Sequence, residues 1–130
     1  MMSSKSASRI LVALGAVAAS FAAVPASAAA QAAFNGTWSV LIVTDKGPCD
    51  RAYRYPVRVT NGRVSYAGQA DFDVVGQVRP NGALRVTVSR GAQRASGSGR
   101  LTGQSGSGTW SGFGESACSG SWTAEKRGEG

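Results

Sequence analysis

A pattern of glycine, a hydroxyl residue, tryptophan and a second hydroxyl residue occurs three times in this chain, at Gly36–Ser39, Gly108–Ser111 and Gly120–Thr123. The last two copies lie within the stretch Gly106–Ala124, and the first opens a region where apolar and polar residues alternate. An alternation of period two is typical of β-strands. We interpret the three copies as strands that lie side by side, with the last strand closing onto the first.

The N-terminal segment has the features of a cleavable signal peptide. Lys5 and Arg9 precede an apolar run, Ile10–Val24, which is short for a membrane span, and small residues follow it. We predict cleavage before Ala29 or Gln31, with an uncleaved N-terminal anchor as the alternative. The expected location of the protein is therefore periplasmic or secreted.

We expect residues 1–30 to be the signal peptide and residues 31–130 to form a single domain, because about 100 residues are enough for one core. Of the 14 Lys and Arg, two fall in the signal peptide, so 12 basic and 7 acidic residues remain and the net charge is +5. We expect a monomer with no transmembrane segment after the signal is removed.

The two cysteines of the chain, Cys49 and Cys118, both lie in the predicted domain. An even cysteine count in an exported protein indicates a disulfide. We predict a bond between these two residues, with two free thiols as the alternative.

Turn residues predict how the strands are aligned. Asn61-Gly62 is typical of a two-residue type I′ hairpin turn, which places Val59 opposite Val64 and Val57 opposite Tyr66. Further turns at 80–82, at 91–92 and around 104–107 predict these opposite pairs: Val78 and Leu84, Val88 and Ala95, Leu101 and Trp110, Trp110 and Gly120, and Trp122 and Gly108.

In the last two pairs each indole covers a glycine, an arrangement that stabilises glycine-rich strands. The alternative is that these glycines belong to low-complexity sequence. About eight strands joined by short links favour an all-β fold, a small up-and-down antiparallel barrel. A flattened two-sheet sandwich is the alternative fold. An even strand number brings Cys49 and Cys118 to the same end.

The chain has no histidine, which excludes Ser-His and Cys-His catalysis, His-bound zinc and His-bound haem iron. Asp71 and Asp73 form a pair of carboxylates, but two acids alone make a weak cation site. We assign both to a polar outer face and expect no enzymatic activity, no metal and no cofactor.

Six aromatic residues fall on the inward-facing positions of the predicted strands: Trp38, Tyr53, Tyr55, Tyr66, Trp110 and Trp122. We expect them to fill the core, because an eight-stranded barrel is narrow enough for side chains to pack it solid. An aromatic-lined ligand pocket at the barrel mouth is the alternative.

The outward-facing positions carry seven arginines: Arg54, Arg58, Arg63, Arg79, Arg85, Arg94 and Arg100. The guanidinium group makes forked contacts with phosphate and carboxylate groups. We therefore expect an anionic surface partner, such as lipopolysaccharide or a polyanionic glycan, and we do not expect nucleic acid for an exported protein.

The Gly36-x-Trp38 motif in an eight-stranded barrel resembles the start of the calycin barrels, which are the lipocalins and avidins. That resemblance implies that a basic residue after the last strand, Lys126 or Arg127, packs on Trp38. The chain also resembles small exported proteins of alphaproteobacteria, whose labels refer to adhesion or haem utilisation. The matching residues are Trp38, Tyr55-Pro56-Val57, Asn61-Gly62 and Cys118-Ser119-Gly120-Ser121-Trp122.

These observations favour a non-enzymatic, envelope-associated barrel that binds anionic surface components weakly through its outer arginines. The alternative is a carrier of small ligands that uses the aromatic interior. Enzyme inhibition or an adhesion-type role is a more distant hypothesis.

Overall fold

The computed structural model describes residues 25–113 and 117–128. Residues 1–24, which hold most of the predicted signal peptide, lie outside the described residues. The elements in chain order are α2 (Ala26–Ala32), β1 (Gly36–Lys46), β2 (Ala52–Thr60), β3 (Arg63–Tyr66), β4 (Asp73–Val78), β5 (Ala83–Arg90), β6 (Gln93–Thr102), β7 (Ser105–Phe113) and β8 (Cys118–Gly128). Both predicted cleavage positions, before Ala29 and before Gln31, fall within α2.

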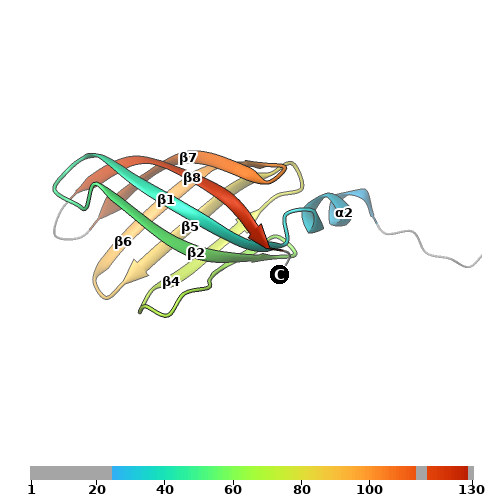
Figure 1. The fold of residues 1–130 in the computed structure, drawn as a ribbon, viewed down its shortest axis with the longest axis horizontal. Helices are drawn as coiled ribbons and strands as arrows, with labels where there is room; N and C mark the ends of the chain where they lie inside the picture. Colours follow the sequence, from blue (N-terminus) through green and yellow to red (C-terminus); the bar gives the residue numbers. More distant parts are fainter. Residues whose placement is uncertain (1–24, 114–116, 129–130) are drawn as a thin grey trace, which may run out of the picture.

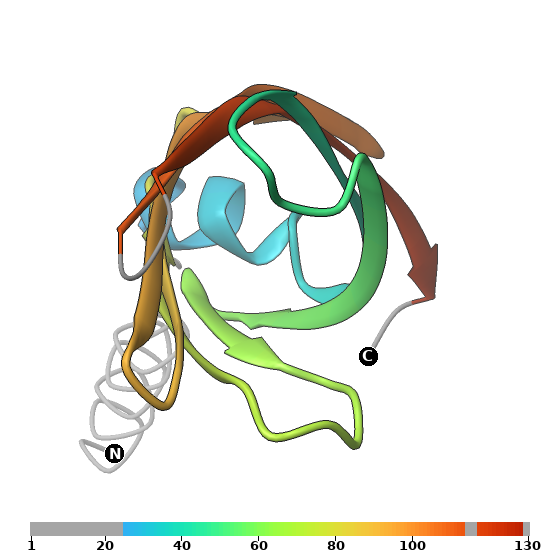
Figure 2. The ribbon, with the colours of Figure 1, turned by 90° about the vertical axis from the view of Figure 1, so that its left-hand side faces the viewer.

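The eight strands form one closed antiparallel sheet (Figure 1). Each strand pairs with the next one in the chain, and β8 pairs with β1. The view along the barrel in Figure 2 shows the strands arranged around a common axis. The predicted up-and-down barrel of eight strands is therefore confirmed, and the alternative of a two-sheet sandwich is wrong.

Most of the predicted register is confirmed. Asn61 and Gly62 adopt φ angles of 49° and 84°, as a type I′ turn requires, and Val59 lies opposite Val64. Gly82, with a φ of 91°, ends the 80–82 loop. The other pairs with the predicted partners are Val57 and Tyr66, Val78 and Leu84, Val88 and Ala95, Trp110 and Gly120, and Trp122 and Gly108.

The predicted pairing of Leu101 with Trp110 is wrong. Trp110 lies opposite Gly97, and Leu101 lies opposite Gly106. The reason is a shorter turn than expected: Gly103 adopts a φ of 61°, so β6 and β7 are joined by two residues and β7 begins at Ser105. A Cβ atom on Gly106 would lie 2.5 Å from Leu101 Cδ2, so the leucine covers that glycine.

The sheet is most weakly joined between β3 and β4. Only two register pairs link these strands within the described residues, Arg63 with Gln77 and Val64 with Gly76. Beyond them β4 and the 67–72 loop diverge from β3, which Figure 2 shows at the lower edge of the barrel. Val75 on β4 is 63% exposed there. This divergence widens the end of the barrel that carries the 67–72 loop.

The opposite end of the barrel is closed by α2 and the residues that follow it (Figure 2). Phe34 is buried in the core, and its carbonyl accepts a hydrogen bond of 2.9 Å from Trp38 Nε1. Gln31 Nε2 donates to Val78 O at 2.8 Å, which holds the helix against β4. Lys126, which lies opposite Trp38 in the β1–β8 ladder, donates to Ala33 O at 3.3 Å.

Arg127, the other basic residue that the calycin resemblance implied, forms an exposed ion pair of 3.2 Å with Glu125. Of the two, Lys126 therefore occupies the position beside Trp38. Trp38 itself is 1% exposed and belongs to the centre of the core. The other buried members of the core are Phe34, Val40, Val57, Val59, Val64, Val74, Val78, Leu101, Trp122 and Ala124.

Candidate functional site

A cavity of about 460 Å³ that is open at one end lies within the barrel, so the core is not packed solid as expected. Its wall includes Trp38, Val40, Ile42, Tyr55, Val57, Leu84, Val86, Val88, Leu101, Trp110 and Trp122. Part of this space lies against β6, which presents the small residues Ala95 and Gly97 to the interior. A Cβ atom on Gly97 would meet no heavy atom closer than 3.5 Å. The small residues of β6 therefore leave a volume that the aromatic residues do not fill.

The three indoles expose apolar surface to the cavity. Trp38 Nε1 donates to Phe34 O at 2.9 Å, Trp110 Nε1 to Val43 O at 3.0 Å, and Trp122 Nε1 to Ser98 O at 3.1 Å. Each indole nitrogen is therefore satisfied by a main-chain carbonyl of the barrel. A ligand would meet ring carbons rather than unpaired donors on these residues.

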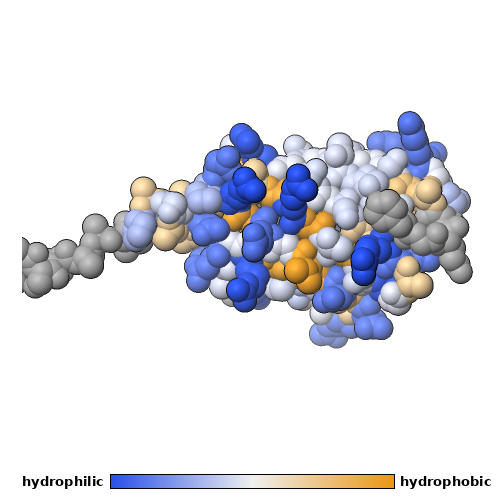
Figure 3. Space-filling view, turned by 180° about the vertical axis from the view of Figure 1, so that it is seen from behind, coloured by the Kyte–Doolittle hydropathy of each residue, from blue (hydrophilic) through white to orange (hydrophobic). Residues whose placement is uncertain are grey.

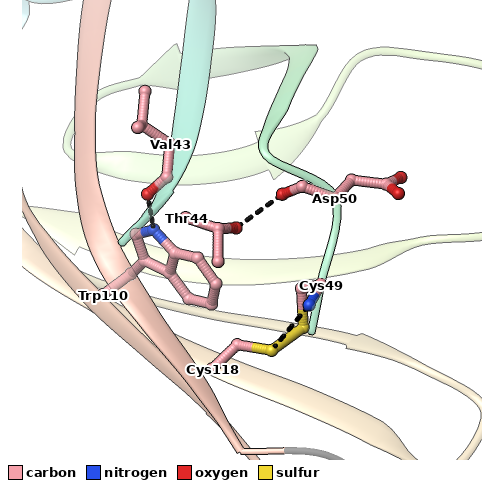
Figure 4. Close-up of a disulfide and its surroundings, with 6 residues drawn as sticks. All are labelled: Val43, Thr44, Cys49, Asp50, Trp110 and Cys118. Carbon is pink, nitrogen blue, oxygen red and sulfur yellow. Dashed lines mark hydrogen bonds between the residues drawn. A yellow bond between two sulfur atoms is a disulfide. The ribbon is translucent and has the colours of Figure 1, made fainter. Parts of the chain in front are cut away.

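A disulfide between Cys49 and Cys118 links the loop after β1 to the start of β8, as predicted (Figure 4). The two Cα atoms are 6.2 Å apart, within the ordinary range for a disulfide. Cys49 N also donates to Cys118 Sγ at 3.2 Å. Nearby, the buried Thr44 donates from Oγ1 to Asp50 O at 2.6 Å. These contacts hold the loop beside the open end of the cavity.

Four aromatic rings pack together at that open end. Tyr55 stacks on Phe72 with ring centroids 6.1 Å apart, and Tyr66 meets Phe72 edge-on at 5.4 Å. Tyr53 lies 5.9 Å from both Tyr55 and Phe72 and is 40% exposed. Ala70 N donates to Tyr66 Oη at 3.3 Å, which ties the 67–72 loop to this aromatic cluster.

Tyr55 is a half-buried phenol of the aromatic cluster. Burial, with a smaller contribution from neighbouring Tyr53, raises the pKa of Tyr55 from 10.0 to about 12. Its hydroxyl therefore stays neutral at physiological pH. It can act as a hydrogen-bond donor to a ligand but brings no negative charge into the cavity.

Arg90 is a candidate site residue that the sequence analysis missed. It lines the cavity, and its guanidinium carbon lies 5.2 Å from the centroid of the Phe72 ring. The signal was present in the sequence, because Val86, Val88 and Arg90 are two residues apart and so share the inward face of β5. Gln93, opposite Arg90 on β6, also lines the cavity.

The seven arginines of the expected anion-binding face lie at outward positions of the barrel. Arg63 and Arg85 flank Gln77 across β3, β4 and β5. Arg100 lies opposite Ala83, whose carbonyl accepts a hydrogen bond from Arg79 N. Arg63, Arg79, Arg85 and Arg100 therefore occupy adjacent rows, and we call them the arginine patch.

The remaining three outward arginines lie outside the arginine patch. Arg54 Nη1 donates to Ser39 Oγ at 2.9 Å, Arg58 is half-buried on the same strand, and Arg94 lies towards the open end. On the back face in Figure 3 strongly hydrophilic side chains lie towards both ends of the barrel, with apolar residues exposed between them. The expected outer set is thus one patch of four and three separate residues.

The part of the chain that the structure describes holds neither a metal-binding cluster nor a membrane-spanning helix. Residues 25–113 and 117–128 contain no group of three acidic or cysteine side chains placed to hold a metal ion, and Asp71 and Asp73 are both exposed. No helix among those residues has the length and apolar character needed to cross a membrane. Comparison of the chain with known protein families, curated proteins and solved structures finds no match.

Proposed function

We propose that this protein binds a small apolar molecule inside its barrel. The observation that carries the proposal is the cavity of about 460 Å³ with its aliphatic and aromatic wall. Pockets that hold small molecules have volumes of roughly 300–1,000 Å³ and are mostly apolar with a few polar groups. The proposal thus favours the small-ligand carrier over the anion-binding surface.

The energetics of apolar burial support binding in this cavity. Burial of about 200 Å² of apolar ligand surface contributes on the order of 5 kcal/mol before the entropic cost of association. The closed end, the satisfied indole nitrogens and the disulfide-held loop hold the cavity in shape before a ligand arrives. Preorganisation of this kind lowers the cost of binding. The disulfide also supports an exported role, because disulfides persist in oxidising compartments.

A displacement assay tests this proposal. A neutral apolar fluorophore, N-phenyl-1-naphthylamine, should gain fluorescence when it is titrated into the purified protein, and a medium-chain alcohol should displace it. Trp110 and Trp122 line the cavity, so their emission should change in the same titration. An unchanged fluorophore signal together with unchanged tryptophan emission would contradict the proposal.

A second function, weak binding of anionic surface components, is supported by the arginine patch. Neighbouring strands are about 4.8 Å apart, so Arg63 and Arg85, which are two strands apart, lie about 10 Å from each other at the backbone, close to the screening length of about 8 Å at physiological salt. A lipopolysaccharide or a sulfated glycan fits such a patch, and binding should weaken as salt is added. Retention on a sulfated-glycan column across a salt gradient tests it, and the absence of retention at low salt would exclude it.

A further inference from the structure

We propose that the ligand of the cavity is a single-chain amphiphile with an anionic head, and that Arg90 binds its carboxylate at the mouth of the barrel. This inference rests on the proposed function, since it concerns which apolar molecule enters the same cavity. It adds a head-group site, which the apolar wall alone does not require.

The first argument for a head-group site is the position of Arg90 at the end of β5. The inward side chains of β5 run Leu84, Val86, Val88 and Arg90, so an apolar wall ends in one guanidinium at the open end. Arg90 is exposed, and its guanidinium lies 5.2 Å above the Phe72 ring. An aromatic face attracts the guanidinium but occupies none of its five N–H donors. The Phe72 ring thus holds a forked donor at the mouth and leaves that donor available to a carboxylate.

Further donors lie around Arg90. Gln93 is opposite Arg90 in the β5–β6 ladder and lines the cavity, and its amide supplies two N–H groups. Tyr53 also lines the cavity at this end. A carboxylate accepts hydrogen bonds only, so a mouth rich in donors complements it better than it complements an ammonium or a hydroxyl head.

Asp50 is the acidic residue among the described residues that line the cavity. Its carboxylate does little to disfavour an anionic ligand head. Its main-chain oxygen takes the hydrogen bond from Thr44. In Figure 4 its carboxylate points away from Thr44 and Trp110, two residues that line the cavity. Arg90 therefore supplies the charge that faces a ligand head beside Phe72.

The volume of the cavity sets the length of the chain. A water-sized group takes about 30 Å³, and a cavity of about 460 Å³ therefore holds at most roughly fifteen such groups. A methylene group is of similar size, so a chain of about ten carbons fits with its head at the mouth. A two-chain lipid exceeds this volume.

Three ligands that share a ten-carbon chain and differ in the head group distinguish the head-group site from the apolar cavity: decanoate, decan-1-ol and decyltrimethylammonium. Titration calorimetry with the purified exported protein should give a dissociation constant for decanoate about tenfold lower than for the other two. Arg90→Gln should remove that preference, so that decanoate binds no more tightly than decan-1-ol. Arg90→Lys, which keeps the charge but loses the fork, should retain part of it. Arg94→Gln, at an outward position of the same end, is the matched control and should retain all of it.

The outcomes are distinguishable. Equal affinity for the three ligands, with no effect of Arg90→Gln, would overturn the head-group site while the apolar cavity stands. Binding of none of them would overturn the proposed function itself. A thermal unfolding curve that matches the unsubstituted protein excludes misfolding of Arg90→Gln, which is expected because Arg90 is exposed.

Discussion

The indole of Trp122 lies directly against Gly108 on the neighbouring strand, and a Cβ atom on Gly108 would be 2.7 Å from Trp122 Nε1. The same indole covers Gly99, where an added Cβ would be 2.6 Å from Trp122 Cζ2. The glycines of β6 and β7 thus leave a flat surface on which the Trp122 ring packs. The register that juxtaposes them was readable from the sequence, because Trp122 and Gly108 belong to copies of one repeated pattern.

Gly108→Ala should destabilise the fold by about 2 kcal/mol, because overpacking a tight contact forces the ring or the strand to move. Gly112→Ala is the matched control on the same strand, since the nearest atom to its added Cβ is Trp110 Cζ3 at 3.4 Å. Urea unfolding curves measure both. Equal destabilisation by the two substitutions would show that loss of glycine, rather than crowding of the added Cβ against Trp122 and the still nearer main-chain oxygen of Ser98, is responsible.

The double substitution Cys49→Ala and Cys118→Ala should lower the free energy of unfolding by about 4 kcal/mol, because the bond closes a long loop in the unfolded chain. The two cysteines are 69 residues apart. Urea unfolding with and without reductant provides the measurement. Reduction of the unsubstituted protein should have the same effect, and an unchanged midpoint in both cases would contradict the expectation.

Gly97→Val should lower the affinity for the neutral fluorophore about tenfold, since its methyl groups extend into the cavity from a position with room for a Cβ atom. Ser98→Val is the matched control, because this adjacent residue is exposed on the other face of β6 and is not among the residues that line the cavity. The displacement titration compares the two variants. If both bind as tightly as the unsubstituted protein, the ligand does not occupy this part of the barrel.

The stability of the protein should fall between about pH 10 and about pH 12, because burial raises the pKa of Tyr55 from 10.0 to about 12. The unfolded chain loses the Tyr55 proton before the folded protein does, so this contribution is fully present below pH 10.0 and is lost as the pH rises through about 12. The loss should be on the order of 2 kcal/mol. Urea midpoints across that range should decline less for Tyr55→Phe, and identical slopes would contradict the assignment.

Arg85→Ser combined with Arg100→Ser should lower the salt concentration that elutes the protein from a sulfated-glycan column. The reason is that both residues belong to the arginine patch, where neighbouring charges act together. Arg54→Ser combined with Arg94→Ser removes the same charge outside the patch and should have a smaller effect. Equal shifts for the two pairs would indicate that net charge, rather than the patch, governs retention.

Several features of the fold were determined by the sequence alone. Alternation of period two and the turn chemistry of Asn61-Gly62 specify which residues face inward and which pair across a hairpin, because both depend on neighbouring residues only. The even number of strands then brings Cys49 and Cys118 to one end. The predicted partner of Leu101 was wrong because the sequence around Gly103 is compatible with a two-residue turn and with a longer one.

The cavity and its mouth were decided by the tertiary structure. Whether Trp38, Trp110 and Trp122 fill the barrel depends on the barrel radius and on the side chains opposite each ring. Both depend on the positions of all eight strands together. Alternation alone assigns Arg90 to the inward face. The β4–β5 register, in which Asp73 pairs with Ser89, then places Phe72 beside Arg90. Only the tertiary structure brings Tyr55, from β2, against Phe72, because β2 and β4 are not paired and contact between them depends on how the whole sheet curves and not on local periodicity.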